Sequence, residues 1–464
     1  MTDIAAAITE VKALLKNRLN TSKSVCDLHG QNETYFPKMI PDAVAFPEST
    51  LEVSEIVKIC AKYQCPIIPW GVGTSLEGHA LALHGGITLN MSEMSNIFDI
   101  NSEDMFAIVQ PGVTREILNK ELRSTGLFFS VDPVANATLG GMAATRASGT
   151  TAVLYGTMRE NVLAMEIVLA DGRVIRTGTK AKKSSAGYDL NKLFVGSEGT
   201  LGIITELTVA LKGQPEAISA AVCDFPTIDN AVDVVITAIQ MGIPMARIEL
   251  IDEISIRAIN QYSKLEYPEK PHLFMEFHGS KSSVASQAES IANIAKDFNA
   301  GDFQWSTKPE DLNKLWSARY QAYYATKALF PNQIGMSTDI CVPISKLAQA
   351  IKDTQNDLKE FNVIGSIIGH VGDGNYHTLL FSDPNNPEDL KLNKLLASRM
   401  AHRALDVGGT ITGEHGIGIG KLNFMEQEHG ESLSIMTDLK RLFDPQNIMN
   451  PGKMIDLDSS PKNY

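Results

Sequence analysis

Apolar residues recur along this chain at two spacings, and the two spacings predict different elements. Near the start they return every three or four residues, which predicts a helix packed on its own domain. The positions are Ile4, Ile8, Val11 and Leu15. Up to about residue 214, short runs rich in Val and Ile alternate with helical spacing and with glycine clusters. Strands interleaved with helices are therefore expected.

Individual strands can be predicted in this first half. The prolines at 66 and 69 bracket the end of one strand, and Phe106–Val109 forms another. Residues 161–169 lead into Asp171-Gly172, a favoured hairpin turn, and residues 173–176 return.

The pattern of apolar and polar residues changes after residue 214. Residues 212–216 are polar and contain both Gly and Pro, as linkers between domains often do. Longer helical patterns follow at 311–329 and 345–361, separated by β runs such as 272–278. A turn-rich stretch, 443–452, lies close to the C-terminus. We place a domain boundary between residues 214 and 215.

Composition narrows the function classes. The chain has 464 residues, 44% of them hydrophobic, enough for two or three domains. Its 41 basic and 54 acidic residues give a net charge of −13, which argues against a nucleic-acid partner. Five cysteines without a C-x-x-C pair indicate reduced thiols and a cytoplasmic protein. No apolar stretch reaches the roughly 18–20 residues of a transmembrane segment, whereas peripheral contact with the inner membrane surface stays open.

Glycine loops supply the first candidate chemistry. In residues 69–79, Gly71, Gly73 and Gly78 allow a close approach of backbone N–H groups to an anion, and Thr74 and Ser75 add hydroxyl donors. The loop matches neither the nicotinamide fingerprint nor the ATPase loop. Similar small-residue stretches occur at 132–149 and 196–204. Three such loops in one domain favour an extended flat ligand such as FAD.

A predicted hairpin with two histidines supplies the second candidate chemistry. Asp373-Gly374 is a favoured two-residue turn between apolar strands, and it would set His370 directly opposite His377. Opposed residues have Cβ atoms about 4.5–5.5 Å apart, so the two imidazoles could share a metal ion. Glu414, between glycines with His415, could complete an open ligand set and leave His415 as a base. Such a set accepts Zn, Mn or Fe, with Zn or Mn favoured.

Taken together, these motifs resemble the FAD-linked 2-hydroxyacid dehydrogenases of the vanillyl-alcohol oxidase type, and among them the cytochrome-type flavin D-lactate dehydrogenases. The resemblance runs from about residue 40 to 455. It implies an α+β fold, with a two-subdomain FAD-binding domain of the vanillyl-alcohol oxidase/p-cresol methylhydroxylase type and an α+β cap domain with an antiparallel sheet. The expected division is 1–214 for the FAD domain, 215–423 for the cap with the metal site, and 424–464 for a segment that returns to the FAD domain.

The resemblance also implies roles for particular residues. His370, His377 and Glu414 match metal ligands, His415 matches the catalytic base, and Arg319 matches the residue that grips the substrate carboxylate. Tyr323, one helical turn beyond Arg319, and Leu379 would line the substrate pocket. The expected cofactor-binding residues are Trp70, Gly71, Val72, Gly73, Thr74, Ser75, Gly78, Asp132, Pro133, Thr138, Gly140, Gly141, Ala144, Ser148, Gly149, Glu198, Gly199, Gly202, Ile203, Glu414 and Asn450.

The implied reaction is oxidation of D-lactate and short D-2-hydroxyacids to the 2-oxoacid, by hydride transfer to flavin N5 with help from the metal and the base. Electrons would leave to a quinone, a cytochrome or another electron-transfer protein, and a homodimer is compatible with the sequence. Glycolate and D-2-hydroxyglutarate are alternative substrates. Ser337 and Leu379 stand where dicarboxylate-specific relatives carry Lys and Asn, which favours a monocarboxylate. A flavin-free metal hydrolase using the same ligands and an inactive binding subunit are the rival classes.

Overall fold

The chain forms two compact units in the structure, a computed structural model that describes residues 2–32 and 34–457. The first unit holds the chain up to Ser148, then Gly156–Gln214, and the part from Glu414 onward. The second holds Gly149–Tyr155 and Pro215–Gly413. Compact units are not identical with domains, so the division into 1–214, 215–423 and 424–464 stays a prediction.

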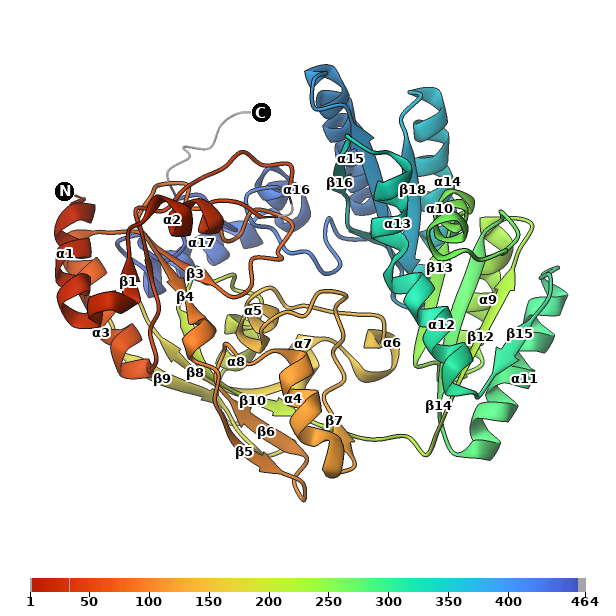
Figure 1. Cartoon of the computed structure of the whole chain (residues 1–464), viewed down its shortest axis with the longest axis horizontal. Helices are drawn as coiled ribbons and strands as arrows, with labels where there is room; N and C mark the ends of the chain where they lie inside the picture. The colour runs from red at the N-terminus through yellow and green to blue at the C-terminus, as the bar shows by residue number, and fades with distance from the viewer. Residues whose placement is uncertain (1, 33, 458–464) are drawn as a thin grey trace. The chain divides into compact units, whose positions relative to one another are not determined.

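The first unit contains two main sheets (Figure 1). In the four-stranded sheet the order is β1-β2-β4-β3, and β4 pairs in parallel with both β2 and β3. These strands are β1 Leu19–Asn20, β2 Ala43–Ala45, β3 Ile67–Trp70 and β4 Ile87–Asn90. The five-stranded sheet is antiparallel, in the order β5-β6-β10-β8-β9. Its strands are β5 Ile97–Asn101, β6 Phe106–Val109, β8 Val162–Val168, β9 Val174–Gly178 and β10 Ile203–Ala210. A small third sheet pairs β7 Leu127–Phe128 with β11 Lys212–Gly213.

Helices complete the first unit and close two hydrophobic cores. One core joins the four-stranded sheet to α1 Ile4–Leu15 and α3 Thr50–Tyr63. The other lies on the five-stranded sheet and includes the helical residues Leu118, Met142, Met158 and Phe194. The remaining helices here are α2 Lys23–His29, α4 Arg115–Glu121, α5 Leu139–Ala144, α7 Met158–Asn161, α8 Leu190–Phe194, α16 Met425–His429 and α17 Ser432–Phe443. Short 3₁₀ turns lie at Lys16–Arg18, Met91–Glu93, Leu122–Ser124 and Leu422–Phe424.

The second unit is built on an antiparallel eight-stranded sheet (Figure 1). Its order is β15-β12-β14-β13-β18-β19-β16, and β17 also pairs with β19. The strands are β12 Ala217–Asp224, β13 Arg247–Ile251, β14 His272–Gly279, β15 Gln304–Ser306, β16 Ile334–Ser337, β17 Ile340–Cys341, β18 Gly365–His370 and β19 Asn375–Ser382. Its helices are α6 Ala152–Tyr155, α9 Ile228–Gln240, α10 Glu253–Ser263, α11 Lys281–Asp297, α12 Pro309–Tyr320, α13 Ala322–Leu329, α14 Ile344–Glu360 and α15 Pro387–Asp406. A 3₁₀ turn, Val371–Asp373, joins β18 to β19.

One face of this sheet carries buried polar residues among apolar ones. Phe274 and Ile368 belong to the core formed with α10, α12 and α13. Side chains alternate between faces along a strand, so Glu276, two residues after Phe274, and His370, two residues after Ile368, share that face. The strand pairing puts Glu249 opposite Phe274, on the same face. Charged groups buried in this way need partners.

Most predicted elements are confirmed. The α+β mixture is observed, Phe106–Val109 is β6, and β8 and β9 form the predicted hairpin with Gly172 in the left-handed region at φ 82°. The helix predicted over 311–329 is instead two helices, α12 and α13, which meet at Gln321.

The register predicted for the histidine hairpin was wrong. His370 pairs with Asn375, and His377 pairs with Ile368. The connection is longer than a two-residue turn because Val371 is fully buried and begins a 3₁₀ turn that Gly374 closes at φ 77°. A Cβ on Gly374 would lie only 2.1 Å from the Val342 oxygen, so this position requires glycine. His370 and His377 nevertheless share one sheet face, since Asn375 and His377 are two residues apart.

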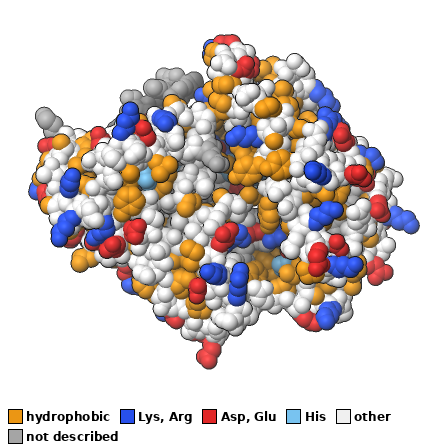
Figure 2. Space-filling view, viewed as in Figure 1, with side chains coloured by type: hydrophobic (Ala, Val, Ile, Leu, Met, Phe, Trp, Pro, Cys, Tyr) orange, Lys and Arg blue, Asp and Glu red, His pale blue; other side chains and the backbone are white. Residues whose placement is uncertain are grey.

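The surface gives little sign of a large single-charge patch. On the face shown in Figure 2, Lys and Arg side chains are interspersed with Asp and Glu. None of the helices within residues 2–32 and 34–457 has both the length and the apolar character needed to cross a membrane.

Asp252 links two elements of the second unit. It caps the N-terminus of α10, where Oδ1 accepts from the Ser255 N–H at 2.8 Å and Oδ2 accepts from the Ile367 N–H at 2.7 Å. Burial raises the pKa of Asp252 to about 7, although both N–H groups favour the charged form.

This pKa predicts a pH dependence of stability. Between the ordinary value of 3.8 and about 7, the folded carboxyl holds a proton that the unfolded chain has lost, so the free energy of unfolding should fall as pH rises through that range. Asp252→Asn cannot titrate and should lose this part of the slope. Urea unfolding at several pH values measures it, with Asp229→Asn, an exposed carboxylate in the first turn of α9, as control. Equal slopes in wild type and Asp252→Asn would contradict the assignment.

Candidate active site

Two imidazoles lie together on the polar face of the second unit's sheet. His370 ends β18 and His377 lies within β19, with ring centroids 5.3 Å apart and planes at 79°. Their exposed fractions are 8% and 6%. The hairpin therefore does bring the two predicted ligands together, through a diagonal rather than a direct pair.

Each imidazole is oriented by an oxygen at Nδ1. The His370 Nδ1 lies 2.7 Å from Oε1 of Glu249, and the His377 Nδ1 lies 3.1 Å from the carbonyl oxygen of Thr338. Both oxygens are acceptors, so each Nδ1 must donate. A neutral imidazole that donates through Nδ1 has its lone pair on Nε2, the atom that can bind a cation.

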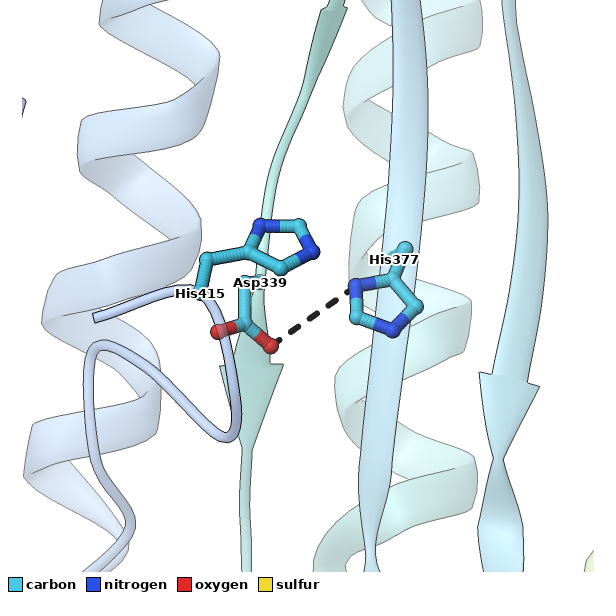
Figure 3. Close-up of side chains that lie close together, drawn as sticks. All are labelled: Asp339, His377 and His415. Carbon is cyan, nitrogen blue, oxygen red and sulfur yellow. Dashed lines mark ion pairs between the residues drawn. The ribbon is translucent and has the colours of Figure 1, made fainter. Parts of the chain in front are cut away.

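Asp339 stands beside His377 and orders the neighbouring backbone (Figure 3). It is almost fully buried, and its Oδ1 lies 3.6 Å from the His377 Nδ1, the ion pair drawn in the figure. The amide of Asn375 donates to Oδ1 at 2.8 Å, and the hydroxyl of Thr412 donates to Oδ2 at 2.6 Å. These bonds fix the end of the chain segment that leads into Gly413.

Glu414 and His415 follow Gly413 directly, so the anchored segment brings them to the histidines through the chain itself. Possible ligand atoms lie within 4.8 Å of one another in two groups: His370, His377 and Glu414, and Asp339, His377 and His415. Figure 3 shows the second group, with His415 extending from its loop. Imidazole nitrogens with carboxylate oxygens suit a divalent transition metal. The donor set thus fits the predicted ion.

Arg319 is buried and contacts Glu249, the carboxylate that also contacts His370. It lies in α12 with 3% of its surface exposed, and both Nε and Nη2 donate to Oε2 of Glu249, at 3.0 and 2.6 Å. Glu249 is itself fully buried. One carboxylate therefore holds the predicted substrate-binding arginine with one oxygen and a predicted metal ligand with the other.

The other two predicted pocket residues fare differently. Leu379 is two residues beyond His377 on the same face of β19, directly opposite Ser337 of β16. Tyr323 lies in α13, beyond Gln321, the residue at which α12 ends and α13 begins. Its role stays a prediction.

The glycine loops meet in the first unit, after β3. A Cβ on Gly71 would lie 2.4 Å from the Thr138 hydroxyl oxygen. The first and second loops can approach this closely because Gly71 has no side chain. The second and third loops are joined by hydrogen bonds from the Gly196 and Glu198 N–H groups to the carbonyls of Ala143 and Ala144, both 2.8 Å. The backbones of the three loops therefore lie close together in the first unit.

The predicted cofactor residues have several structural settings. Trp70 ends β3, and Gly71 to Gly78 form the following loop, with Gly73 and Gly78 at φ 74° and 76°. Thr138 caps α5, the helix that contains Gly140, Gly141 and Ala144. Ile203 is buried in the core at the start of β10, and Gly202 packs against Ile167. Asp132 and Pro133 precede α5, Ser148 is the last residue of the first unit before its break, and Gly149 belongs to the second unit.

Asn450 ties the tail to these loops. Its amide donates to the carbonyls of His79 at 3.0 Å and Glu198 at 2.8 Å, and its oxygen accepts from Lys453 at 2.9 Å. The turn-rich C-terminal stretch therefore braces the loops of the first unit from a distance of more than 250 residues in sequence.

The same part of the first unit contains three buried ionisable residues, Glu198, His79 and Lys453. Glu198 accepts from the N–H groups of Ile417 and Gly418 at 2.7 and 2.8 Å, and lies 3.2 Å from His79. Burial acts to raise the pKa of Glu198, but His79 and the two N–H groups outweigh it and the pKa is lowered. Burial lowers the pKa of Lys453 to about 7, against the opposing effect of Glu198.

Sequence reasoning missed Glu249 and Asp339 as site residues. A signal for Glu249 existed: it is the acidic centre of Arg247–Ile251, a strand-like run that is otherwise apolar in the middle. Charged residues are almost never fully buried unless they are paired. Its partners Arg319 and His370 are 70 and 121 residues away, however, and no local pattern identifies them.

Two parts of the chain match known protein families. Residues 41–178 match "FAD binding domain" and residues 214–454 match "FAD linked oxidases, C-terminal domain". Among solved structures, p-cresol methylhydroxylase with bound substrate has a TM-score of 0.81 at 18% identity, covering 98% of this chain and 97% of that one. This likeness establishes a fold of the p-cresol methylhydroxylase type.

Relatives at higher identity narrow the family. A probable mitochondrial D-lactate dehydrogenase of Danio rerio is 48% identical, over 95% of this chain and 89% of its own length. The mitochondrial D-lactate dehydrogenase [cytochrome] of Arabidopsis thaliana is 44% identical, over 97% and 80%. Glycolate oxidase subunit GlcD of Bacillus subtilis is 36% identical, over 90% of each. The chain belongs to the FAD-linked oxidase family that includes these enzymes.

Gly413 offers a test of the local geometry. A Cβ there would lie 2.4 Å from the Asn375 amide nitrogen and 3.2 Å from Asp339 Oδ1, so Gly413→Ala should displace both supports of the site. We expect divalent-ion affinity to fall roughly 10–100-fold, the usual effect of losing a supporting contact to a ligand, with FAD content unchanged. Isothermal titration with Zn²⁺ and the flavin absorbance measure the two quantities.

Gly213→Ala is the control, since a Cβ there would meet nothing within 4 Å. Unchanged Zn²⁺ affinity in Gly413→Ala would show that this close approach does not support the ligands.

Proposed function

We propose that this protein oxidises D-lactate and short D-2-hydroxyacids to the corresponding 2-oxoacids, with FAD as electron acceptor in the protein. The family supports a flavin-linked oxidation. The similar proteins from Danio rerio and Arabidopsis thaliana are named as D-lactate dehydrogenases, and this supports D-lactate as the substrate. The flavin-free hydrolase weighed above leaves the matched FAD-binding domain without its ligand.

The observation that carries the proposal is the shared carboxylate of Glu249. A 2-hydroxyacid has its hydroxyl on the carbon next to its carboxylate, so its site needs an anion-binding group close to the group that handles the hydroxyl. Arg319 and His370 bind the two oxygens of Glu249, which holds them within reach of one small molecule. The guanidinium of Arg319 would bind the planar carboxylate of the substrate through two hydrogen bonds, and this would orient C2 of the substrate.

His415 is the proposed base, and it takes the proton of the C2 hydroxyl. When bound, FAD would accept the hydride from C2 and a divalent cation would polarise the hydroxyl oxygen. His370, His377 and Glu414 are the proposed ligands, with Zn or Mn the favoured ion. Leu379 would contact the methyl group of lactate, on the sheet face that carries His377.

The electron acceptor and the compartment belong to the proposal as well. A cytochrome is the favoured acceptor among the candidates, because the Arabidopsis thaliana and Kluyveromyces lactis relatives are named D-lactate dehydrogenase [cytochrome]. Their names place them in mitochondria, so the cytoplasmic prediction is not confirmed.

Glycolate is the second candidate substrate, favoured by the Bacillus subtilis relative. A site that accepts lactate through Leu379 would also admit glycolate, but would lose the methyl contact. A second carboxylate next to Leu379 would be buried without a cation, which is costly.

The role of His415 predicts a specific kinetic defect. His415→Ala should keep FAD but lose roughly 10²–10⁴-fold in the rate of flavin reduction by D-lactate, the usual range for a general base. Stopped-flow absorbance in a single turnover measures it. His402→Ala, an exposed histidine of α15, serves as control. A normal rate in His415→Ala would remove this residue from the reaction.

The pocket predicts a substrate order. With an artificial electron acceptor, kcat/KM should be high for D-lactate and D-2-hydroxybutyrate, lower for glycolate, and poor for D-2-hydroxyglutarate and L-lactate. Ser337→Lys would place a cation directly across from Leu379, and should raise the relative kcat/KM for D-2-hydroxyglutarate. A wild-type preference for the dicarboxylate would overturn the pocket argument, whereas a preference for glycolate would move the protein to the second candidate.

A further inference from the structure

We propose that Glu249 is a positioning residue that sets the donor geometry of Arg319 and the tautomer of His370 together. This rests on the proposed function, because it assigns the arginine to the substrate carboxylate and the histidine to a metal ion. Glu249 lies in the middle of β13, with no exposed surface, and both of its oxygens are engaged.

The contact with Arg319 selects which edge of the guanidinium faces a substrate. A guanidinium has N–H donors along two edges. In Arg319, the edge formed by Nε and Nη2 donates to Oε2 of Glu249. The edge formed by Nη1 and Nη2 still has N–H groups for a second carboxylate. Glu249 therefore fixes Arg319 so that the other edge can take a planar monocarboxylate in a bidentate manner.

Charge favours the same arrangement. A guanidinium buried to 3% exposure without a counter-ion would be strongly unfavourable, and Glu249 supplies that counter-ion from the sheet. Arg319 can then stay buried and ordered before the substrate arrives. Less conformational freedom is lost on binding when the donor is already fixed.

The contact with His370 selects the nitrogen that meets a cation. Ionised Glu249 can only accept, so His370 must donate through Nδ1 and keep its lone pair on Nε2. A glutamine in place of Glu249 has one acceptor and one donor group. If its oxygen serves Arg319, its NH₂ faces His370, which would then have to accept at Nδ1 and carry its proton on Nε2. That tautomer cannot bind a metal through Nε2.

The neighbouring strand provides a matched control. Glu276 of β14 is also buried, and it likewise joins an arginine and a histidine: Arg247 at 3.1 Å and His278 at 2.8 Å. Within the described chain, the side-chain hydrogen bonds of Glu276 go to Arg247 and His278, and none joins it to Arg319 or His370. Glu276→Gln thus repeats the chemistry of Glu249→Gln, including the burial, outside the proposed site.

The experiment measures binding rather than turnover. FAD-loaded protein is freed of metal with a chelator and titrated with Zn²⁺ by calorimetry, and pyruvate binding is followed through the flavin absorbance. We expect Glu249→Gln to weaken Zn²⁺ binding roughly 10–100-fold, the usual loss for such a contact, and to weaken pyruvate binding because a neutral amide oxygen holds Arg319 less firmly than a carboxylate does. Glu276→Gln should leave both affinities within a few-fold of wild type.

A second variant separates positioning from folding. Glu249→Asp keeps the negative charge, so His370 should still donate through Nδ1 and Zn²⁺ should bind more tightly than in Glu249→Gln. Equal losses in Glu249→Gln and Glu276→Gln, or no rescue by Asp, would reduce Glu249 to a structural role and overturn the inference. Wild-type affinities in Glu249→Gln would also overturn it. Wild-type protein that binds neither Zn²⁺ nor pyruvate would instead overturn the proposed function itself.

Discussion

The candidate site depends on a carboxylate that is buried where a carboxylate is costly. Glu249 sits in the central region of an antiparallel sheet with no exposed surface, so its charge must be compensated inside the fold. Arg319 from α12 and His370 from β18 supply the compensation, and they are thereby fixed in relation to each other. Once these are fixed, the hairpin places His377, and Asp339 with Thr412 places the start of the loop that carries Glu414 and His415.

Local pattern was a good guide to elements and to their faces. Strand β6, the β8–β9 hairpin and the two histidines on one face all follow from alternation and turn residues. The register of the histidine hairpin did not, because Asp373-Gly374 is a favoured turn only if the residues before it are free to pair. Val371 is drawn into the core instead, and the ladder ends at His370 and Asn375. Burial of one valine therefore outweighed the preference of the turn.

Long-range pairs were beyond the reach of sequence pattern. Glu249 finds Arg319 across 70 residues and His370 across 121, and Glu198 meets the Ile417 N–H across 219. Nothing in the periodicity of a strand says which helix will pack on it. What a pattern does reveal is the anomaly itself, an acidic residue in the middle of a buried strand, and such an anomaly indicates that a partner exists without saying where.

The same physical solution recurs in both units, which separates what is general from what is specific in this site. Glu198 faces His79 in the first unit, while Glu276 joins His278 and Arg247 in the second, and each is a buried glutamate beside an imidazole. A carboxylate beside a histidine is therefore not by itself a mark of catalysis in this fold. Glu249 differs because its histidine, His370, has a second imidazole with its ring centroid 5.3 Å away. The proposed function rests on the convergence of several ordinary ion pairs on one face of the sheet, rather than on any one of them.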